Sequence, residues 1–151
     1  MIKTITNIDF FDDVALVSIN NIPNHVKNIA GILNIIGNNG ISIDMISQSA
    51  PHKDKINISF TLSQDDLGEV VVATQEFKKL SPMISTDVNG NNTKILLKGE
   101  GMRSEFGVAA ELFTILSDND IQVKLITTAE TEISCLIDIK DVDKAKEILK
   151  K

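Results

Sequence analysis

The sequence predicts an α+β protein made of two similar halves. The main observation is an internal repeat, in which residues 41–46 (ISIDMI) reappear as residues 121–126 (IQVKLI) at an offset of 80 residues (121 − 41). The neighbouring segments recur in the same order, and Ile58 corresponds to Ile133 at an offset of 75 (133 − 58), so the first copy has extra loop residues. Such a unit is too long for a solenoid repeat, and each copy is interpreted as a small domain.

The first copy has alternating strand and helix patterns. Residues 14–22 alternate apolar and polar side chains as a strand does, and residues 26–39 carry apolar side chains three and four apart as a helix does. Strands at 41–45 and 56–62, a helix at 65–80 and a strand at 83–88 follow. The predicted buried stripes are Val26, Ile29, Ala30, Leu33 and Ile36 in the first helix, and Leu67, Val70, Val71, Thr74, Phe77 and Leu80 in the second. The order β-α-β-β-α-β is the ferredoxin-like arrangement, in which two helices cover one face of an antiparallel sheet.

The second copy repeats this pattern without a final strand. Strands are predicted at 94–98, 122–128 and 133–139, and helices at 108–119 and 142–149. Residues 2–8 (IKTITNI) alternate like a strand that the first copy does not need. We therefore expect the N-terminal segment to complete the second sheet. The domains are then residues 14–90, and residues 1–13 plus 91–151, with the first inserted into the second.

Composition narrows the possible functions. The chain has six Phe and neither Trp nor Tyr, so the predicted core is aliphatic, and the single cysteine, Cys135, lies in an apolar run where a buried thiol is expected. The net charge of −6 disfavours nucleic acid as a partner. No apolar run is long enough to span a membrane, and no signal peptide is visible, so a cytoplasmic location is expected. The pattern indicates no cofactor and no metal site.

Both copies place a sharp loop between the first strand and the first helix, at residues 21–27 and 99–107. Free amides at a helix N-terminus attract a carboxylate, and glycines allow a close backbone approach. The same residues are also typical of an ordinary tight turn. The paired carboxylates at 12–13 and 65–66 are interpreted as the start of a strand and the start of a helix, respectively.

The second loop carries a family resemblance. Residues 98–110 (KGEGMRSEFGVAA) resemble the "G-x-G-M-[RK]-S-H-P-G-V-A" signature of the second ACT domain of aspartokinases. Residues 126–130 (ITTAE) and 133–137 (ISCLI) are similar to that family's "I-S-T-S-E" and "I-S-V-L-I". Residues 41–48 (ISIDMISQ) resemble its "I-N-I-D-M-I-x-Q" in the first ACT domain. The resemblance covers essentially the whole chain.

The resemblance implies a regulatory module rather than an enzyme. Aspartokinases carry their catalytic site in a separate kinase domain, whose phosphate loop and catalytic lysine have no counterpart in this sequence. The implied role is allosteric control of an aspartokinase-type enzyme of lysine, threonine and methionine biosynthesis. The implied ligand is a free amino acid, threonine or lysine, bound between ACT domains of a homodimer, with an amino-acid-kinase subunit as a further possible partner.

The family's effector pocket maps onto both repeats. The predicted effector-binding residues are Asn24, His25, Val26, Lys27, Asn28, Ile29, Ser42, Ile43, Asp44 and Gln48 in the first repeat, and Val108, Ala109, Gln122, Val123, Ala129 and Glu130 in the second. In this scheme loop amides take the carboxylate of the ligand, and acidic and amide side chains take its ammonium group.

The first loop departs from the family. Where the family has "P-D-K-P-G", this chain has PNHVK at residues 23–27, so it lacks an aspartate, a proline and a glycine. Asn24 removes a charge-assisted bond to an ammonium group, and Lys27 adds a side chain where the backbone should come close. We therefore expect an altered effector site, and the alternative is a ligand-free dimerisation or assembly module. Arg103, the only arginine, is expected either to grip a carboxylate or to lie on the surface.

Overall fold

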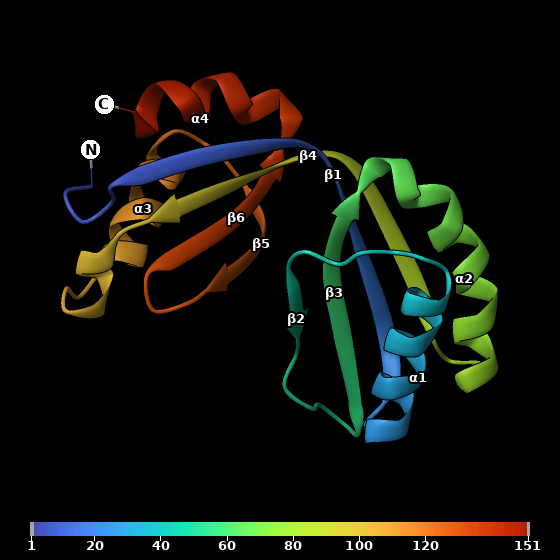
Figure 1. The fold of residues 1–151 in the computed structure, drawn as a ribbon. Coiled ribbons are helices and arrows are strands. Elements are labelled where there is room, and N and C mark those ends of the chain that lie inside the picture. The colour runs from blue at the N-terminus through green and yellow to red at the C-terminus, as the bar shows by residue number, and fades with distance from the viewer. Residues whose placement is uncertain (1, 151) are drawn as a thin grey trace. The chain divides into compact units, whose positions relative to one another are not determined.

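The computed structural model describes residues 2–150 and divides the chain into two compact units (Figure 1). One unit contains residues 13–90, and the other combines residues 2–12 with residues 91–150. The division into two ACT domains, one inserted into the other, stays a prediction. Within the described residues, no helix is long and apolar enough to cross a membrane.

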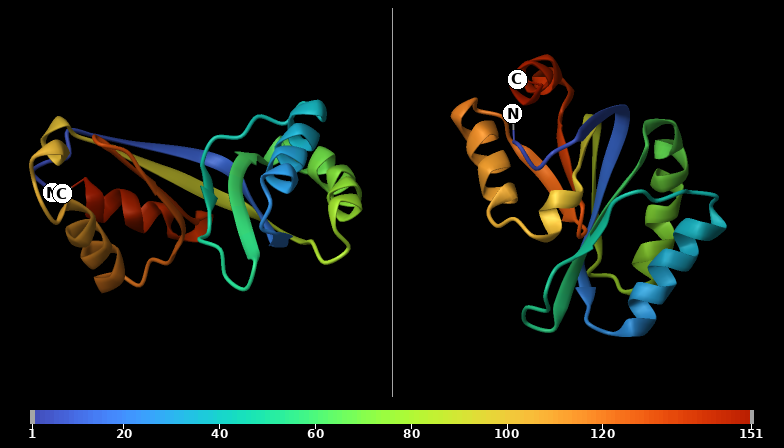
Figure 2. Two further views of the ribbon diagram at one scale, coloured as in Figure 1. Left: turned by 90° about the horizontal axis from the view of Figure 1, so that it is seen from below. Right: turned by 60° about the vertical axis from the view of Figure 1, so that its left-hand side comes forward.

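The 13–90 unit has the predicted β-α-β-β-α-β order. Its elements are β1 (Asn7–Pro23), α1 (Val26–Asn38), β2 (Ile46–Gln48), β3 (Lys55–Ser63), α2 (Leu67–Leu80) and β4 (Ser85–Lys98), with the first part of β1 and the last part of β4 lying in the other unit. The strands are ordered β2-β3-β1-β4, and β1 pairs antiparallel with β3, with Val17 opposite Phe60. Helices α1 and α2 cover one face of these strands (Figure 2). The ferredoxin-like expectation is confirmed for this unit.

The strand predicted at 41–45 is wrong, because the strand in this region is β2, at Ile46–Gln48. Met45 and Ile41 are buried, as their alternating pattern suggested. However, the Met45 amide donates to the hydroxyl of buried Thr61 (2.9 Å), while the Thr61 amide donates to the Met45 carbonyl (2.9 Å). A side chain therefore takes one bond of the ladder, and regular pairing starts only at Ile46.

The core of the 13–90 unit is aliphatic, with Phe60 and Phe77 at its centre. The buried face of α1 is formed by Ile32 and Ile36, whereas three members of the predicted stripe, Val26, Ala30 and Leu33, are exposed. On α2 the buried residues are Val70, Ala73 and Phe77, and the predicted Val71 is exposed. Both helices carry apolar side chains on two faces, so periodicity alone does not select the face that meets the sheet.

The second unit has a matching arrangement. Besides parts of β1 and β4, it contains α3 (Val108–Asp118), β5 (Val123–Thr128), β6 (Glu132–Asp138) and α4 (Val142–Leu149), with strand order β1-β4-β6-β5. These four elements lie within one residue of their predicted bounds at each end. Its core joins residues of the N-terminal segment to residues of β4, β6 and the helices, and includes buried Cys135 as predicted.

Four predicted strands have different bounds in the structure. Residues 2–8 and 14–22 were expected as separate strands, but β1 is one strand, Asn7–Pro23, and residues 2–6 are not a strand. Likewise, the strands expected at 83–88 and 94–98 are parts of β4. Asp12 and Asp13 therefore lie inside β1 rather than at a strand start, and Asp13 has a positive φ of 56°. The alternation lapses at these polar residues, and the strand continues through them with Asp13 in the left-handed region.

Candidate functional site

The first strand-to-helix loop is held by hydrogen bonds within the loop and by one bond to Asp54. The Asn24 amide donates to the Asp54 carbonyl (2.9 Å), and the Asn28 side-chain amide donates to the Pro23 carbonyl (2.9 Å). His25 is the N-cap of α1, and its Nδ1 accepts from the Lys27 amide (3.1 Å). The imidazole therefore takes the capping role that Asn, Asp or Ser usually has. Val26 and Lys27 are exposed, and Ile29 is half-buried.

The remaining predicted residues of this unit lie elsewhere. Ser42 and Asp44 are exposed and Ile43 is half-buried, in the segment that follows α1, and Gln48 lies on β2 opposite Ile58. Because α1 has 13 residues and a helix rises about 1.5 Å per residue, the loop and Ser42 lie roughly 20 Å apart along the helix axis. The unit thus does not gather its predicted residues around one point.

The second repeat shows the same separation. Val108 and Ala109 begin α3, whose N-cap is Gly107 with a positive φ of 83° and no side-chain cap. Gln122 and Val123 follow α3 at its other end, roughly 16 Å away by the same helical rise. The two predicted sets are therefore placed alike in both repeats, at opposite ends of the first helix.

A polar cleft of about 520 Å³ collects the remaining predicted pair, Ala129 and Glu130, together with Met102 and Arg103. Arg103 Nη1 lies 3.3 Å from Glu130 Oε2, and its Nε lies 3.4 Å from Glu100 Oε2. The guanidinium thus contacts two separate carboxylates and grips neither with two nitrogens. All three charged side chains are largely exposed, so these ion pairs add little stability.

The glycine-bearing loop lies against the N-terminal segment of the same chain. A Cβ built on Gly99 would lie 1.9 Å from the carbonyl oxygen of Thr4, and one on Gly101 would lie 2.9 Å from Thr4 Cγ2. The Thr4 hydroxyl donates to Glu105 Oε2 (2.5 Å). Neither Thr4 nor Glu105 is among the site residues predicted from the sequence. The sequence shows only a threonine between Ile2 and Ile5, and this pattern does not reveal the loop that Thr4 meets.

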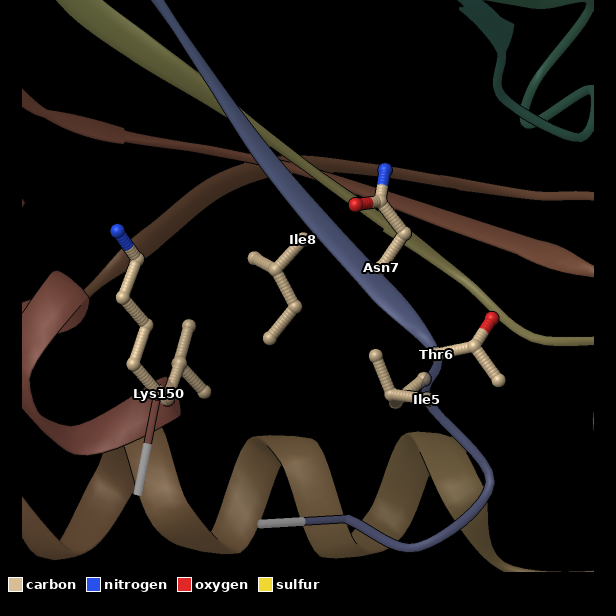
Figure 3. Close-up of a pocket in the computed structure, with 6 residues that line it drawn as sticks. Ile5, Thr6, Asn7, Ile8 and Lys150 are labelled. Atoms are coloured by element: carbon tan, nitrogen blue, oxygen red, sulfur yellow. The ribbon is translucent and has the colours of Figure 1, made fainter.

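A second hollow, of about 350 Å³, lies between the start of β1 and the end of α4 (Figure 3). Its wall is formed by residues 5–8, Leu149 and Lys150, and it includes none of the predicted site residues. The ammonium groups of Lys146 and Lys150 lie 5.4 and 5.9 Å from the centre of the Phe10 ring. These contacts are consistent with cation–π packing of α4 on β1.

Two ionisable side chains have shifted pKa values. Burial raises the pKa of the Cys135 thiol to about 12, which makes a nucleophilic role unfavourable. The Lys140 amide donates to Asp138 (3.0 Å) and lowers the pKa of that carboxyl, desolvation acts against this shift, and Lys124 (3.3 Å) lowers the pKa further. Among residues 2–150, no group of three or more His, Cys, Asp or Glu side chains is placed to hold a metal ion.

Comparisons with known proteins agree with this architecture. A family model described as "ACT domain" matches residues 95–151. The chain is 31% identical over 145 residues to an aspartokinase of Bacillus sp. (strain MGA3). The aligned region covers 96% of this chain and 35% of the relative. The chain thus spans about a third of the length of such curated relatives.

Two solved structures match this chain over almost the whole length of both partners in the comparison. A structure of aspartokinase alpha and beta subunits contains a chain that is 29% identical, with a TM-score of 0.85 and coverage of 96% of this chain and 95% of that one. The ligand-free regulatory subunit of aspartate kinase from Thermus thermophilus shares the fold, with 23% identity, a TM-score of 0.84 and coverage of 97% and 96%.

The matches establish a class, because the family model and the shared fold both indicate an ACT-domain protein. Within that class, the chain is related to aspartokinases along almost its entire length. The resemblance found in the sequence is thereby confirmed.

Proposed function

We propose that this chain is an amino-acid-sensing regulatory module of an aspartokinase-type enzyme, and that its effector pocket forms between ACT domains of two chains. The observation that carries this proposal is the separation of the predicted residues to opposite ends of α1 and of α3. A free amino acid is much shorter than either helix, so a compact pocket requires a second surface to face each set. A homodimer supplies such surfaces twice, by symmetry.

Each unit has an exposed apolar stripe on its first helix, which is the side that we propose faces the partner. Val26, Ala30 and Leu33 form an exposed apolar stripe on one side of α1, with Val26 72% and Leu33 39% exposed. At the repeat offset of 80 residues, the corresponding positions are Phe106, Ala110 and Phe113, where Phe106 is 103% and Phe113 37% exposed. Exposed apolar stripes at equivalent positions of both repeats favour burial against another protein surface. We call them the α1 stripe and the α3 stripe.

Sedimentation of stripe variants tests the dimer. Leu33→Glu and Phe113→Glu each place a charge in a stripe, and both variants should sediment as monomers at tens of micromolar, where the unmodified chain should sediment as a dimer. Val72→Glu is the control, since Val72 is also apolar and, at 62%, even more exposed, but lies on α2. A monomeric unmodified chain, or dimers in all three variants, would refute this part of the proposal.

Titration calorimetry with threonine, lysine and a panel of other amino acids tests the effector role. A binding amino acid at 100 times its Kd should raise the free energy of unfolding by about 2.7 kcal/mol. Asp44→Asn should weaken binding if this carboxylate meets the ammonium group of the ligand. If no amino acid gives heat or thermal stabilisation at millimolar concentration, the effector role is refuted.

The alternative function is a dimerisation and assembly module without a ligand. The first loop favours it, because His25 already caps α1 from within and uses the Lys27 amide, which is then not free for a ligand. This alternative predicts a dimer with silent calorimetry. Under either function a kinase subunit in the cytoplasm is the proposed partner, as suggested by the relative solved with alpha and beta subunits. Co-elution with a purified aspartokinase catalytic subunit tests that association.

A further inference from the structure

Residues 2–6 are packed against their unit through three buried side chains. Ile2, Thr4 and Ile5 are all buried, and the two isoleucines belong to the core of the unit. The Ile5 amide donates to the Ile2 carbonyl (3.0 Å), which closes a tight turn, and the Thr6 amide donates to the Lys98 carbonyl (2.8 Å). The segment thus ends beside the last residue of β4, directly before the glycine-bearing loop.

The loop of residues 99–105 is held from two sides. On one side, the missing side chains of Gly99 and Gly101 make room for the backbone and methyl group of Thr4. On the other side, the Gly99 amide donates to the Thr131 carbonyl (2.9 Å). Thr131 directly follows Ala129 and Glu130, which line the polar cleft with Arg103. One loop therefore connects the N-terminal segment to the cleft.

A single side-chain bond fixes the far end of this loop to the segment. The Thr4 hydroxyl donates to the Glu105 carboxylate (2.5 Å), and a hydroxyl bond to an ionised carboxylate is of the short and strong kind. Within the loop, the Met102 amide donates to the Gly99 carbonyl (3.1 Å), and the Glu105 amide donates to the Gly101 carbonyl (3.0 Å). Arg103 lies within the second of these rings, which spans residues 101–105, so its position at the cleft depends on the position of the loop.

We propose that Thr4 is a positioning residue for the cleft, and that its bond to Glu105 couples residues 2–6 to ligand binding at Arg103 and Glu130. This inference rests on the proposed effector function, because it names the element through which that site acts. A ligand that shifts Arg103 must also shift the loop, and the loop cannot move without straining the Thr4 contacts. Ligand binding at the cleft thereby changes the position of the N-terminal segment.

Native-state amide exchange tests the coupling without any ligand. Thr4→Val keeps the shape of the side chain and removes the hydroxyl, and it should speed exchange at the Met102 and Glu105 amides by roughly tenfold, the loss expected for a bond to a charged group. Thr4→Ser restores the hydroxyl and should restore protection. Thr6→Val is the matched control, because the Thr6 hydroxyl donates to the Lys98 carbonyl (3.2 Å), which lies outside the loop.

Two outcomes would overturn the coupling. The first is equal exchange at both loop amides in Thr4→Val, Thr6→Val and the unmodified chain. The second requires an amino acid that binds the unmodified chain: protection of the loop amides without protection of the Ile5 and Thr6 amides would show that the segment does not respond. If no amino acid binds, the effector proposal fails, while the exchange comparison still decides whether Thr4 positions the loop.

Discussion

Replacing Gly99 by alanine is a direct test of the contact between the loop and the N-terminal segment. Gly99 has a φ of −175°, an extended conformation that any residue adopts, so the substitution adds no backbone strain. Its entire effect comes from the new methyl group, which would lie 1.9 Å from the Thr4 carbonyl oxygen. Ordinary contact begins at 3.4 Å, so the two segments must separate by about 1.5 Å (3.4 − 1.9).

The cost of this separation has a lower and an upper bound. Local distortion of a packed site costs about 1–3 kcal/mol. Complete release of residues 2–6 would expose Ile2 and Ile5, each worth about 1.5–3 kcal/mol, which gives an upper bound of roughly 6 kcal/mol. We expect Gly99→Ala to lower the free energy of unfolding by roughly 2–4 kcal/mol, between these bounds.

Urea unfolding followed by far-ultraviolet circular dichroism measures the change. Gly37→Ala is the control, because Gly37 lies near the end of α1 with nothing within 4 Å of the added methyl group. That variant should be unchanged or more stable by about 0.5–1 kcal/mol, since alanine is the better helix former. A Gly99→Ala protein within about 0.5 kcal/mol of the unmodified chain would refute the reasoning.

Three further predictions concern the same unit. The Cys135 thiol should not react with a thiol reagent at pH 8 until the protein is unfolded, because burial raises its pKa to about 12; prompt reaction in the native state would contradict this. Asp138→Ala should lower the melting temperature at pH 7. The pKa of the Asp138 carboxyl is lowered in the folded protein, so its contribution to stability is lost as the pH falls from the ordinary aspartate pKa through the folded pKa. The difference in melting temperature between the two proteins should therefore shrink over that range, and a constant difference would contradict the prediction. Gly107→Ala should destabilise the start of α3 by about 1 kcal/mol, since its φ of 83° favours glycine, and thermal melts check this.

Sequence reasoning located most of the elements because the two periodicities are local properties. The alternation in β3, the apolar run of β6, and the helical spacing in α2 and α3 follow from side chains within one element. It failed where the deciding contact is distant in sequence. The strand expected at 41–45 is interrupted by the hydroxyl of Thr61, and no local pattern announces that bond.

The candidate site shows the same limit. The family resemblance placed Ala129 and Glu130 in a pocket, and the structure groups them with Arg103 in a cleft. The glycines of the second loop were interpreted as room for a ligand, whereas Gly99 is filled by the backbone of Thr4, 95 residues earlier (99 − 4). A glycine in a sequence shows that something comes close, but not what comes close. The roles of the predicted effector residues stay predictions.

Strands β1 and β4 each continue from one unit into the other. The boundaries between the units, at residues 12–13 and 90–91, both fall inside these strands rather than in loops. A protease that attacks flexible linkers finds no such target at either boundary. A fragment of residues 91–150 would also lack Ile2, Ile5 and the strand beside β4, so it would carry an open sheet edge over an incomplete core. A separate fragment of residues 91–150 is therefore not expected to be stable.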